Sequence, residues 1–178
     1  MPPRAVLIGL PGAGKSTAGA RLAELLDVEF ADSDELIVAR AGRSVAEIFA
    51  EDGEAAFRLL EAAAIEQVLA GFDGVLALGG GAVTTVTVRQ SLLDSGVPIV
   101  LLSAAEDELL RRVGPDSGRP LLTGDPAVRL AELAAARASL YGELAKITVP
   151  TAGYSVDEVA AIVHHRLREY RTEQGSQS

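Results

Sequence analysis

A glycine-rich segment near the N-terminus constrains the fold of this chain more than any other feature. The segment GLPGAGKS, residues 9–16, follows a short apolar run and precedes a stretch with helical spacing of its apolar residues. It matches the pattern G-x-x-x-x-G-K-[ST] at every fixed position, between a strand and a helix, as this phosphate-binding loop requires. Glycines let successive backbone N–H groups point inward, and the helix N-terminus adds partial positive charge. The segment therefore predicts a site for a nucleoside triphosphate.

Two side chains of this loop suit particular groups of a triphosphate complex. Lys15 is one of two lysines in the chain, whereas the other fourteen of the 16 basic residues are arginines. A compact ammonium group on a flexible stem can reach between the β- and γ-phosphates, where a planar guanidinium would be bulkier. The hydroxyl of Ser16 is a suitable ligand for Mg²⁺. The alternative is a glycine-rich turn with a solvated lysine.

The rest of the chain alternates short β-rich runs with longer helical patterns. The runs are residues 4–9, 28–32, 74–79, 97–102 and 146–149. This alternation predicts an α/β fold with a five-stranded parallel sheet and helices on both of its faces. The capping-box pattern S-x-x-E marks helix N-termini. It occurs at Ser44 and Glu47, at Ser103 and Glu106, and at Ser155 and Glu158.

Composition bounds the domain organisation and the classes of partner. With 178 residues, 48% of them hydrophobic, we expect one domain over residues 1–171 and a disordered polar tail over residues 172–178. The net charge of −9 argues against nucleic acid or an anionic membrane as a partner. The absence of cysteine excludes disulfides and thiolate chemistry. No apolar stretch has the length of a membrane span. We expect a cytoplasmic protein, for which the small acidic chain permits a monomer.

Two aspartates lie at the end of the second predicted strand, in FADSDEL. In extended backbone the spacing of Asp32 and Asp34 places both carboxylates on one face, at the strand end where open α/β sheets bind ligands. Asp32 suits Mg²⁺ through a water molecule. Asp34 could accept a proton from an attacking hydroxyl. The alternative is an acidic turn that caps the next helix.

Arginines and glycines further along are candidates for a second substrate. Arg58 and Glu61 share one helical face, and an exposed, solvated pair is an equally good interpretation. Residues 79–81 are three consecutive glycines that either admit a ligand close to the backbone or form a simple turn. The segment 114–125 carries Arg119 and has the composition of a functional loop. Arg137 lies in a helical pattern, where an arginine ordinarily snorkels at the surface.

Taken together, these segments resemble the shikimate kinase family in order and spacing. The matching segments are residues 9–16, Asp32 and Asp34, GRSVAEIF at 42–49, DGEAAFR at 52–58, Glu61, LGGGAV at 78–83, GRPLL at 118–122 and RASLY at 137–141. They cover nearly the whole chain to about residue 165. The resemblance implies a P-loop kinase that transfers the γ-phosphoryl group of ATP to the 3-hydroxyl of shikimate, on the path to chorismate and the aromatic amino acids.

The resemblance also implies residue roles. The shikimate-binding segment covers about residues 32–62, and further residues of the acceptor site follow it in the chain. Asp34 binds the reacting diol and acts as the base. Arg58 and Arg137 hold the carboxylate, Glu61 orients Arg58, and the backbone of Gly80 and Gly81 contacts the substrate. The residues implied for ATP are Gly12, Ala13, Gly14, Lys15, Ser16, Thr17, Arg112 and Arg119. Arg112 lies beside the adenine, and Arg119 lies in a mobile lid of about residues 114–124. Ser16 and, through water, Asp32 are implied for Mg²⁺.

Departures from the family pattern and other activities leave alternatives. Pro150 and Val156 stand where relatives commonly have an aspartate and a proline, so the adenine contacts of residues 150–156 stay open. A gluconate or nucleoside monophosphate kinase would share the P-loop but has less use for the arginine and glycine set. A nucleotide-binding sensor without transferase activity would predict loss of Asp34 or Arg119, and both are present. His164 and His165 are expected at the surface.

Overall fold

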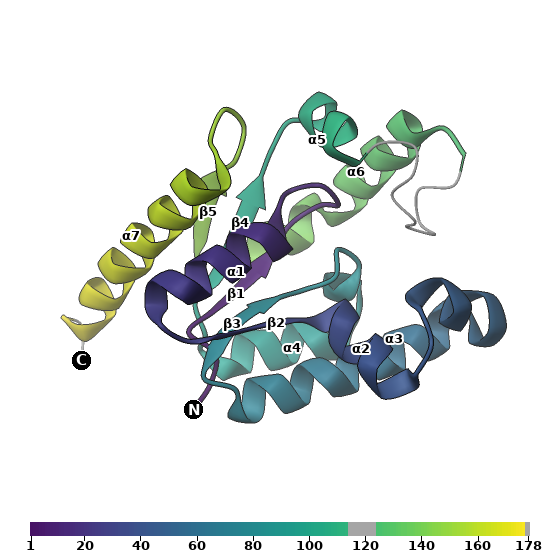
Figure 1. Cartoon of the computed structure of the whole chain (residues 1–178), viewed down its shortest axis with the longest axis horizontal. Helices are drawn as coiled ribbons and strands as arrows, with labels where there is room; N and C mark the ends of the chain where they lie inside the picture. Colours follow the sequence, from purple (N-terminus) through teal and green to yellow (C-terminus); the bar gives the residue numbers. More distant parts are fainter. Residues whose placement is uncertain (114–123, 177–178) are drawn as a thin grey trace.

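A five-stranded parallel sheet with helices on both faces forms the centre of the fold in the computed structural model, which describes residues 1–113 and 124–176 (Figure 1). The strands are β1 (Ala5–Ile8), β2 (Glu29–Asp32), β3 (Gly74–Ala77), β4 (Ile99–Ser103) and β5 (Ile147–Pro150). Their order is β2-β3-β1-β4-β5, and every neighbouring pair is parallel. This architecture confirms the α/β fold predicted from the alternating pattern.

The helices connect successive strands, except the last one, which follows β5. They are α1 (Lys15–Leu26), α2 (Ser33–Ala41), α3 (Val45–Gly71), η1 (Ala82–Thr84), α4 (Val86–Ser95), α5 (Glu106–Val113), α6 (Pro126–Leu144) and α7 (Val156–Gly175). Helices α1 and α7 pack on one face of the sheet, while α3, α4 and the end of α6 pack on the other (Figure 1). Among the described residues, no helix is both long and apolar enough to cross a membrane.

The central strand β1 shows why its sequence is apolar throughout. Ala5 and Leu7 belong to the core on the α1 and α7 side, whereas Val6 and Ile8 belong to the core on the α3 and α4 side. All four residues are buried. A parallel strand covered on both faces needs apolar side chains at odd and even positions alike.

Two of the three predicted capping boxes are confirmed. Ser44 caps α3 and Ser155 caps α7, each with the reciprocal bond from a glutamate side chain. The prediction at Ser103 is wrong, because β4 continues through this residue and α5 begins only at Glu106. The Ser103 carbonyl accepts a hydrogen bond from the backbone N–H of Thr151 instead. Pairing of β4 with β5 thus keeps Ser103 in the sheet.

Two further features concern chain geometry and boundaries. Helix α3 is kinked at Gly53, whose φ of 86° and ψ of 169° are not helical.

Helix α7 continues to Gly175, whereas the sequence led us to expect a disordered tail from residue 172. The Ser176 N–H donates a hydrogen bond to the Thr172 carbonyl and extends the last turn. The expected lid, except residue 124, lies outside the described residues, as do residues 177–178.

Candidate active site

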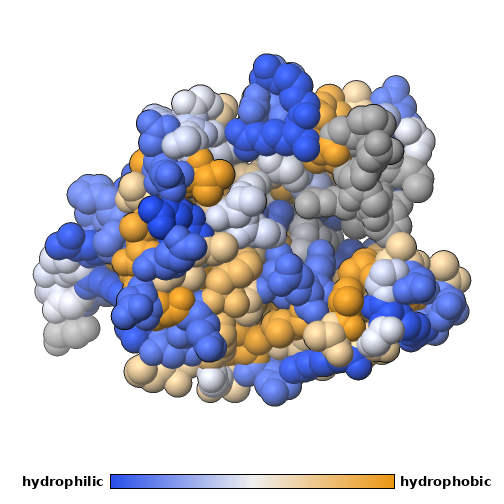
Figure 2. Space-filling view, viewed as in Figure 1, coloured by the Kyte–Doolittle hydropathy of each residue, from blue (hydrophilic) through white to orange (hydrophobic). Residues whose placement is uncertain are grey.

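A cavity of about 550 Å³ lies at the carboxyl ends of β1, β2 and β3. On the face seen in Figure 2, the surface is hollowed between the part formed by α5 and α6 and the part formed by α2 and α3. Open α/β sheets bind their ligands at this edge, because the loops that follow adjacent strands converge there. The predicted site residues that line the cavity are Gly12, Gly14, Lys15, Ser16, Thr17, Asp32, Asp34, Arg58, Glu61, Gly80, Gly81, Arg112 and Arg137. Ala13 is buried and does not line it, and Arg119 lies outside the described residues.

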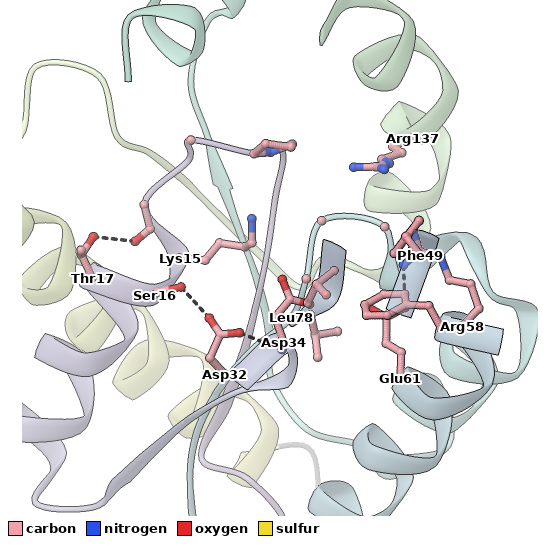
Figure 3. Close-up of a pocket in the computed structure, with 18 of the residues that line it drawn as sticks. Lys15, Ser16, Thr17, Asp32, Asp34, Phe49, Arg58, Glu61, Leu78 and Arg137 are labelled. Atoms are coloured by element: carbon pink, nitrogen blue, oxygen red, sulfur yellow. Dashed lines mark hydrogen bonds and ion pairs between the residues drawn. The ribbon is translucent and has the colours of Figure 1, made fainter. Parts of the chain in front are cut away.

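The P-loop, residues 9–16, connects β1 to α1. Gly14 immediately precedes α1 in the left-handed conformation, with φ of 87°, which a side chain would strain. The Lys15 ammonium group donates hydrogen bonds to the Gly9 carbonyl at 2.8 Å and the Leu10 carbonyl at 3.1 Å. Lys15 is 8% exposed, so its charge is held within the curve of the loop (Figure 3). The loop therefore has the form expected of an anion site at a helix N-terminus.

The two aspartates are placed differently from the sequence prediction. Strand β2 ends at Asp32, which caps α2 by accepting a hydrogen bond from the Asp34 N–H at 2.9 Å. Asp34 is therefore in the first turn of a helix, and the predicted extended backbone through both residues is wrong. The chain turns at Asp32 because its carboxylate satisfies a free N–H group of the helix. Both carboxylates nevertheless line the cavity, and Asp32 Oδ2 accepts a 2.6 Å bond from the Ser16 hydroxyl.

The three glycines after β3 lie against side chains of the site. A Cβ atom on Gly79 would lie 2.5 Å from Asp34 Oδ1 and 3.1 Å from Glu61 Oε1. On Gly81 it would lie 2.1 Å from Arg58 Nη2, and on Gly80 3.1 Å from Arg137 Nη1. Any side chain at Gly79 or Gly81 would overlap the charged groups. The glycines thus let two carboxylates and two guanidinium groups reach the end of one central strand.

Arg58 and Glu61 form a pair in which Glu61 is buried and Arg58 is partly buried, so the interpretation as an exposed, solvated pair is wrong. Arg58 Nη1 donates to Glu61 Oε2 at 2.7 Å, and their side chains are 13% and 0% exposed. A longer contact of 3.3 Å joins Arg58 Nη2 to Glu54. Burial raises the pKa of Glu61 to about 7, although the charge and hydrogen bond of Arg58 lower it; Asp34 adds to the rise and Arg137 opposes it.

Arg137 is also buried, which its helical position did not predict. It is 3% exposed, and within the described part of the chain its Nη1 has no hydrogen-bond partner. In Figure 3 the guanidinium extends from α6 toward the cavity. A buried guanidinium nitrogen without a hydrogen-bond partner is costly unless a ligand supplies an acceptor. Tyr141, one turn later on α6, bonds the Gly80 carbonyl at 3.3 Å, and burial raises its pKa while Arg137 lowers it.

Comparison with known proteins identifies the family to which this geometry belongs. The family model for shikimate kinase matches residues 11–168. The chain belongs to the shikimate kinase family. It is 45% identical to a shikimate kinase of Thermobifida fusca over 93% of this chain and 95% of the relative. It is 48% identical to one of Mycobacterium tuberculosis over 94% of this chain and 93% of the relative.

Solved structures agree with this assignment. A shikimate kinase from Acinetobacter baumannii in complex with shikimate superimposes with a TM-score of 0.90, at 34% identity, over 96% of this chain and 94% of that one. A gluconokinase from Sinorhizobium meliloti gives a TM-score of 0.68 at 22% identity, over 99% and 98% of the two chains. The second likeness shows the fold alone. The shikimate kinase family is thus favoured over the gluconate-type alternative.

The shikimate kinase cavity also has an apolar wall, which residue-by-residue reasoning about charges missed. Val45, Phe49 and Phe57 from α3 and Leu78 after β3 line it. The rings of Phe49 and Phe57 lie 4.8 Å apart at an interplanar angle of 44°. The Arg58 guanidinium carbon lies 5.3 Å from the Phe57 ring centre. The apolar positions in GRSVAEIF and DGEAAFR were visible in the sequence, but the kink at Gly53 was needed to bring the two rings together.

Two other sequence predictions concern residues at or beyond the edge of the cavity. Arg112 lines the cavity and bonds Glu108, Gly12 and Thr151. His165 lies on the surface of α7 and contacts Glu169 at 3.3 Å. Among the residues that the structure describes, no group of three or more histidine or acidic side chains is arranged to hold a metal ion.

Proposed function

We propose that this member of the shikimate kinase family transfers the γ-phosphoryl group of ATP to the 3-hydroxyl of shikimate. The observation that carries the proposal is the division of one cavity into two charged halves. The P-loop with Lys15 forms one half, and two cations, the partly buried Arg58 and the buried Arg137, form the other. Asp34 lies between them in the view of Figure 3. A triphosphate and a small carboxylated alcohol are the ligands that such halves would bind.

The acceptor half binds an acid and orients its hydroxyl groups. Arg58 and Arg137 pair with the carboxylate, because guanidinium groups form strong charge-assisted bonds with it. Glu61 holds Arg58 in place through their 2.7 Å ion pair. The backbone of Gly80 and Gly81 contacts the ring at the end of β3. The apolar wall of the cavity packs against the carbon skeleton.

The reaction then needs a proton acceptor and stabilisation of the transferred group. The 3-hydroxyl oxygen forms the new bond to the γ-phosphorus, and the bond from that phosphorus to the bridging oxygen of ADP breaks. Asp34 takes the hydroxyl proton. Lys15 leaves its two P-loop carbonyls to neutralise charge on the β- and γ-phosphates. Arg119, which lies outside the described residues, is proposed from the sequence alone to add positive charge to the transferred group.

The site contains oxygen ligands that fit Mg²⁺ bound with ATP. The Ser16 hydroxyl and Asp32 carboxylate are 2.6 Å apart at the mouth of the P-loop. Since Mg²⁺ keeps several waters and takes only one or two protein ligands beside phosphates, Ser16 directly and Asp32 through water would hold it. When bound, the ion would neutralise phosphate charge.

Turnover with different acceptors tests the proposal. ADP formation is measured with Mg²⁺-ATP and one of shikimate, gluconate, AMP or no acceptor. We expect rapid ADP formation with shikimate alone. Preference for gluconate or AMP would assign a different kinase specificity, and nucleotide binding without transfer to any acceptor would indicate a sensor.

Replacement of Arg137 by methionine tests the carboxylate site. We expect the Kd for shikimate to rise by about 30-fold or more, because charge-assisted hydrogen bonds to a buried cation are lost. Affinity for ADP should change little. Calorimetric titration of each ligand measures both effects, and Arg129→Met on the same helix is the control, since its exposed side chain pairs with Glu132. Equal losses for both ligands would show a folding defect rather than a role in acceptor binding.

A further inference from the structure

Arg112 joins three separate parts of the chain. Its Nε donates to Glu108 Oε1 at 2.8 Å, within α5, and its Nη1 donates to Thr151 Oγ1 at 2.9 Å. Longer contacts of 3.3 Å run from Nη1 to the Gly12 carbonyl and from Nη2 to the Thr151 carbonyl. The guanidinium therefore connects α5, the P-loop and the residue that follows β5.

Thr151 is the most buried partner of this guanidinium. It is 3% exposed, and its N–H donates to the Ser103 carbonyl at 2.8 Å. Its hydroxyl lies 3.3 Å from the same carbonyl. A hydroxyl has one proton to donate and lone pairs to accept with, so that of Thr151 can donate to Ser103 while it accepts from Arg112. Thr151 thus ties Arg112 to the end of β4, which is part of the rigid sheet.

The P-loop rests on α5 at the same place. A Cβ atom on Gly12 would lie 2.8 Å from Val113 Cγ2 and 3.1 Å from the Leu109 carbonyl oxygen. Gly12 itself has φ of 83°. The loop is therefore packed directly against the last turn of α5, and the contact from Arg112 to the Gly12 carbonyl reinforces that packing.

We propose that Thr151 is a positioning residue for the phosphate-binding loop, and that it acts by holding Arg112 against Gly12. The inference rests on the proposed function, because it takes a polyphosphate as the ligand of the loop. A loop whose amides are already fixed loses less freedom when it binds phosphate. If Arg112 acted only by contacting a nucleotide base, loss of Thr151 would not change the affinity for a polyphosphate that has no base. If Thr151 positions the loop, its loss weakens binding of that polyphosphate as well.

Replacement of Thr151 by valine removes the hydroxyl and keeps the shape of the side chain. Affinities for ADP and for inorganic tripolyphosphate, both with Mg²⁺, are measured by calorimetric titration. We expect both affinities to weaken by about five- to tenfold, which is the size of effect that loss of one ordinary intramolecular hydrogen bond produces. Thr151→Ser should restore both affinities, and Thr148→Val, at an exposed position of the strand β5 that precedes Thr151, should change neither.

The outcomes separate positioning of the loop from other roles. Unchanged affinities in Thr151→Val would overturn the proposal, and so would weaker ADP binding with unchanged tripolyphosphate binding. Failure of the wild-type chain to bind tripolyphosphate would also overturn it. The KM for shikimate should stay constant, which a general loss of structure would not allow. If Thr151→Val does not fold, Arg112→Met is expected to weaken both ligands in the same way. Absence of shikimate turnover in the wild-type chain would refute the proposed function but leave these titrations valid.

Discussion

Replacement of Asp34 by asparagine is expected to lower kcat by about 10³-fold with little effect on ADP binding. Asparagine has nearly the same size, and Asp34 lies in the first turn of α2 with its Oδ1 facing Gly79. The fold should therefore be retained. An amide is not a base at neutral pH, so the proton of the attacking hydroxyl would have no acceptor at this position. Steady-state kinetics with saturating shikimate and Mg²⁺-ATP measure the effect.

Two controls make the Asp34→Asn result specific. Asp94→Asn, on α4 and away from the cavity, should leave kcat unchanged. The Kd of Asp34→Asn for ADP should match that of the wild-type chain. A kcat close to the wild-type value would remove Asp34 from the proton transfer, whereas a parallel loss of ADP binding would point to damage of the neighbouring P-loop.

The stability of the wild-type chain is expected to fall by about 3 kcal/mol, relative to Glu61→Gln, between about pH 4.5 and 7.5. Burial raises the pKa of Glu61 from an ordinary value of 4.5 to about 7. Below 4.5 the folded and unfolded states both hold the proton. Between the two values only the folded state holds it, so folding becomes less favourable as the pH rises. Each pH unit is worth about 1.4 kcal/mol, and the loss is complete above about pH 7.

Urea unfolding at a series of pH values measures this difference. Glu61→Gln has no titrating group at this position. Loss of the ion pair in this variant therefore shifts its free energy of unfolding by a constant amount and adds no dependence on pH. Glu54→Gln is the matched control, because Glu54 also contacts Arg58 but is 58% exposed. A constant difference between wild type and Glu61→Gln across this range would show that Glu61 is ionised in the folded chain even at low pH.

Local features of the sequence predicted much of the fold. The P-loop pattern depends on glycines and a helix start that are adjacent in the chain, and the capping boxes at Ser44 and Ser155 depend on a spacing of three residues. The alternation of apolar runs predicted the parallel sheet. The failure at Ser103 has a non-local cause, since a bond to Thr151, far along the chain, holds that residue in β4.

Burial of charged groups could not be predicted from local spacing. The i, i+3 spacing correctly predicted that Arg58 and Glu61 share one face of a helix. It could not predict that this face lies against the glycines after β3, which decides how far the two side chains are buried. Arg137 has the local pattern of a surface arginine, and its burial depends on packing of α6 against η1 and α4, which are distant in the sequence. The family resemblance suggested both roles because it compares whole sites rather than single elements.

The strand order has a further consequence for the separation of the two ligands. The P-loop follows β1 and the three glycines follow β3, and β1 and β3 are hydrogen-bonded neighbours in the centre of the sheet. Neighbouring strands lie about 4.8 Å apart, a spacing fixed by backbone hydrogen bonds and independent of side chains. The spacing of the P-loop and the three glycines, where they leave the sheet, is therefore set by the backbone. Core and surface side chains away from the cavity could be exchanged extensively over evolutionary time without moving these two loops apart.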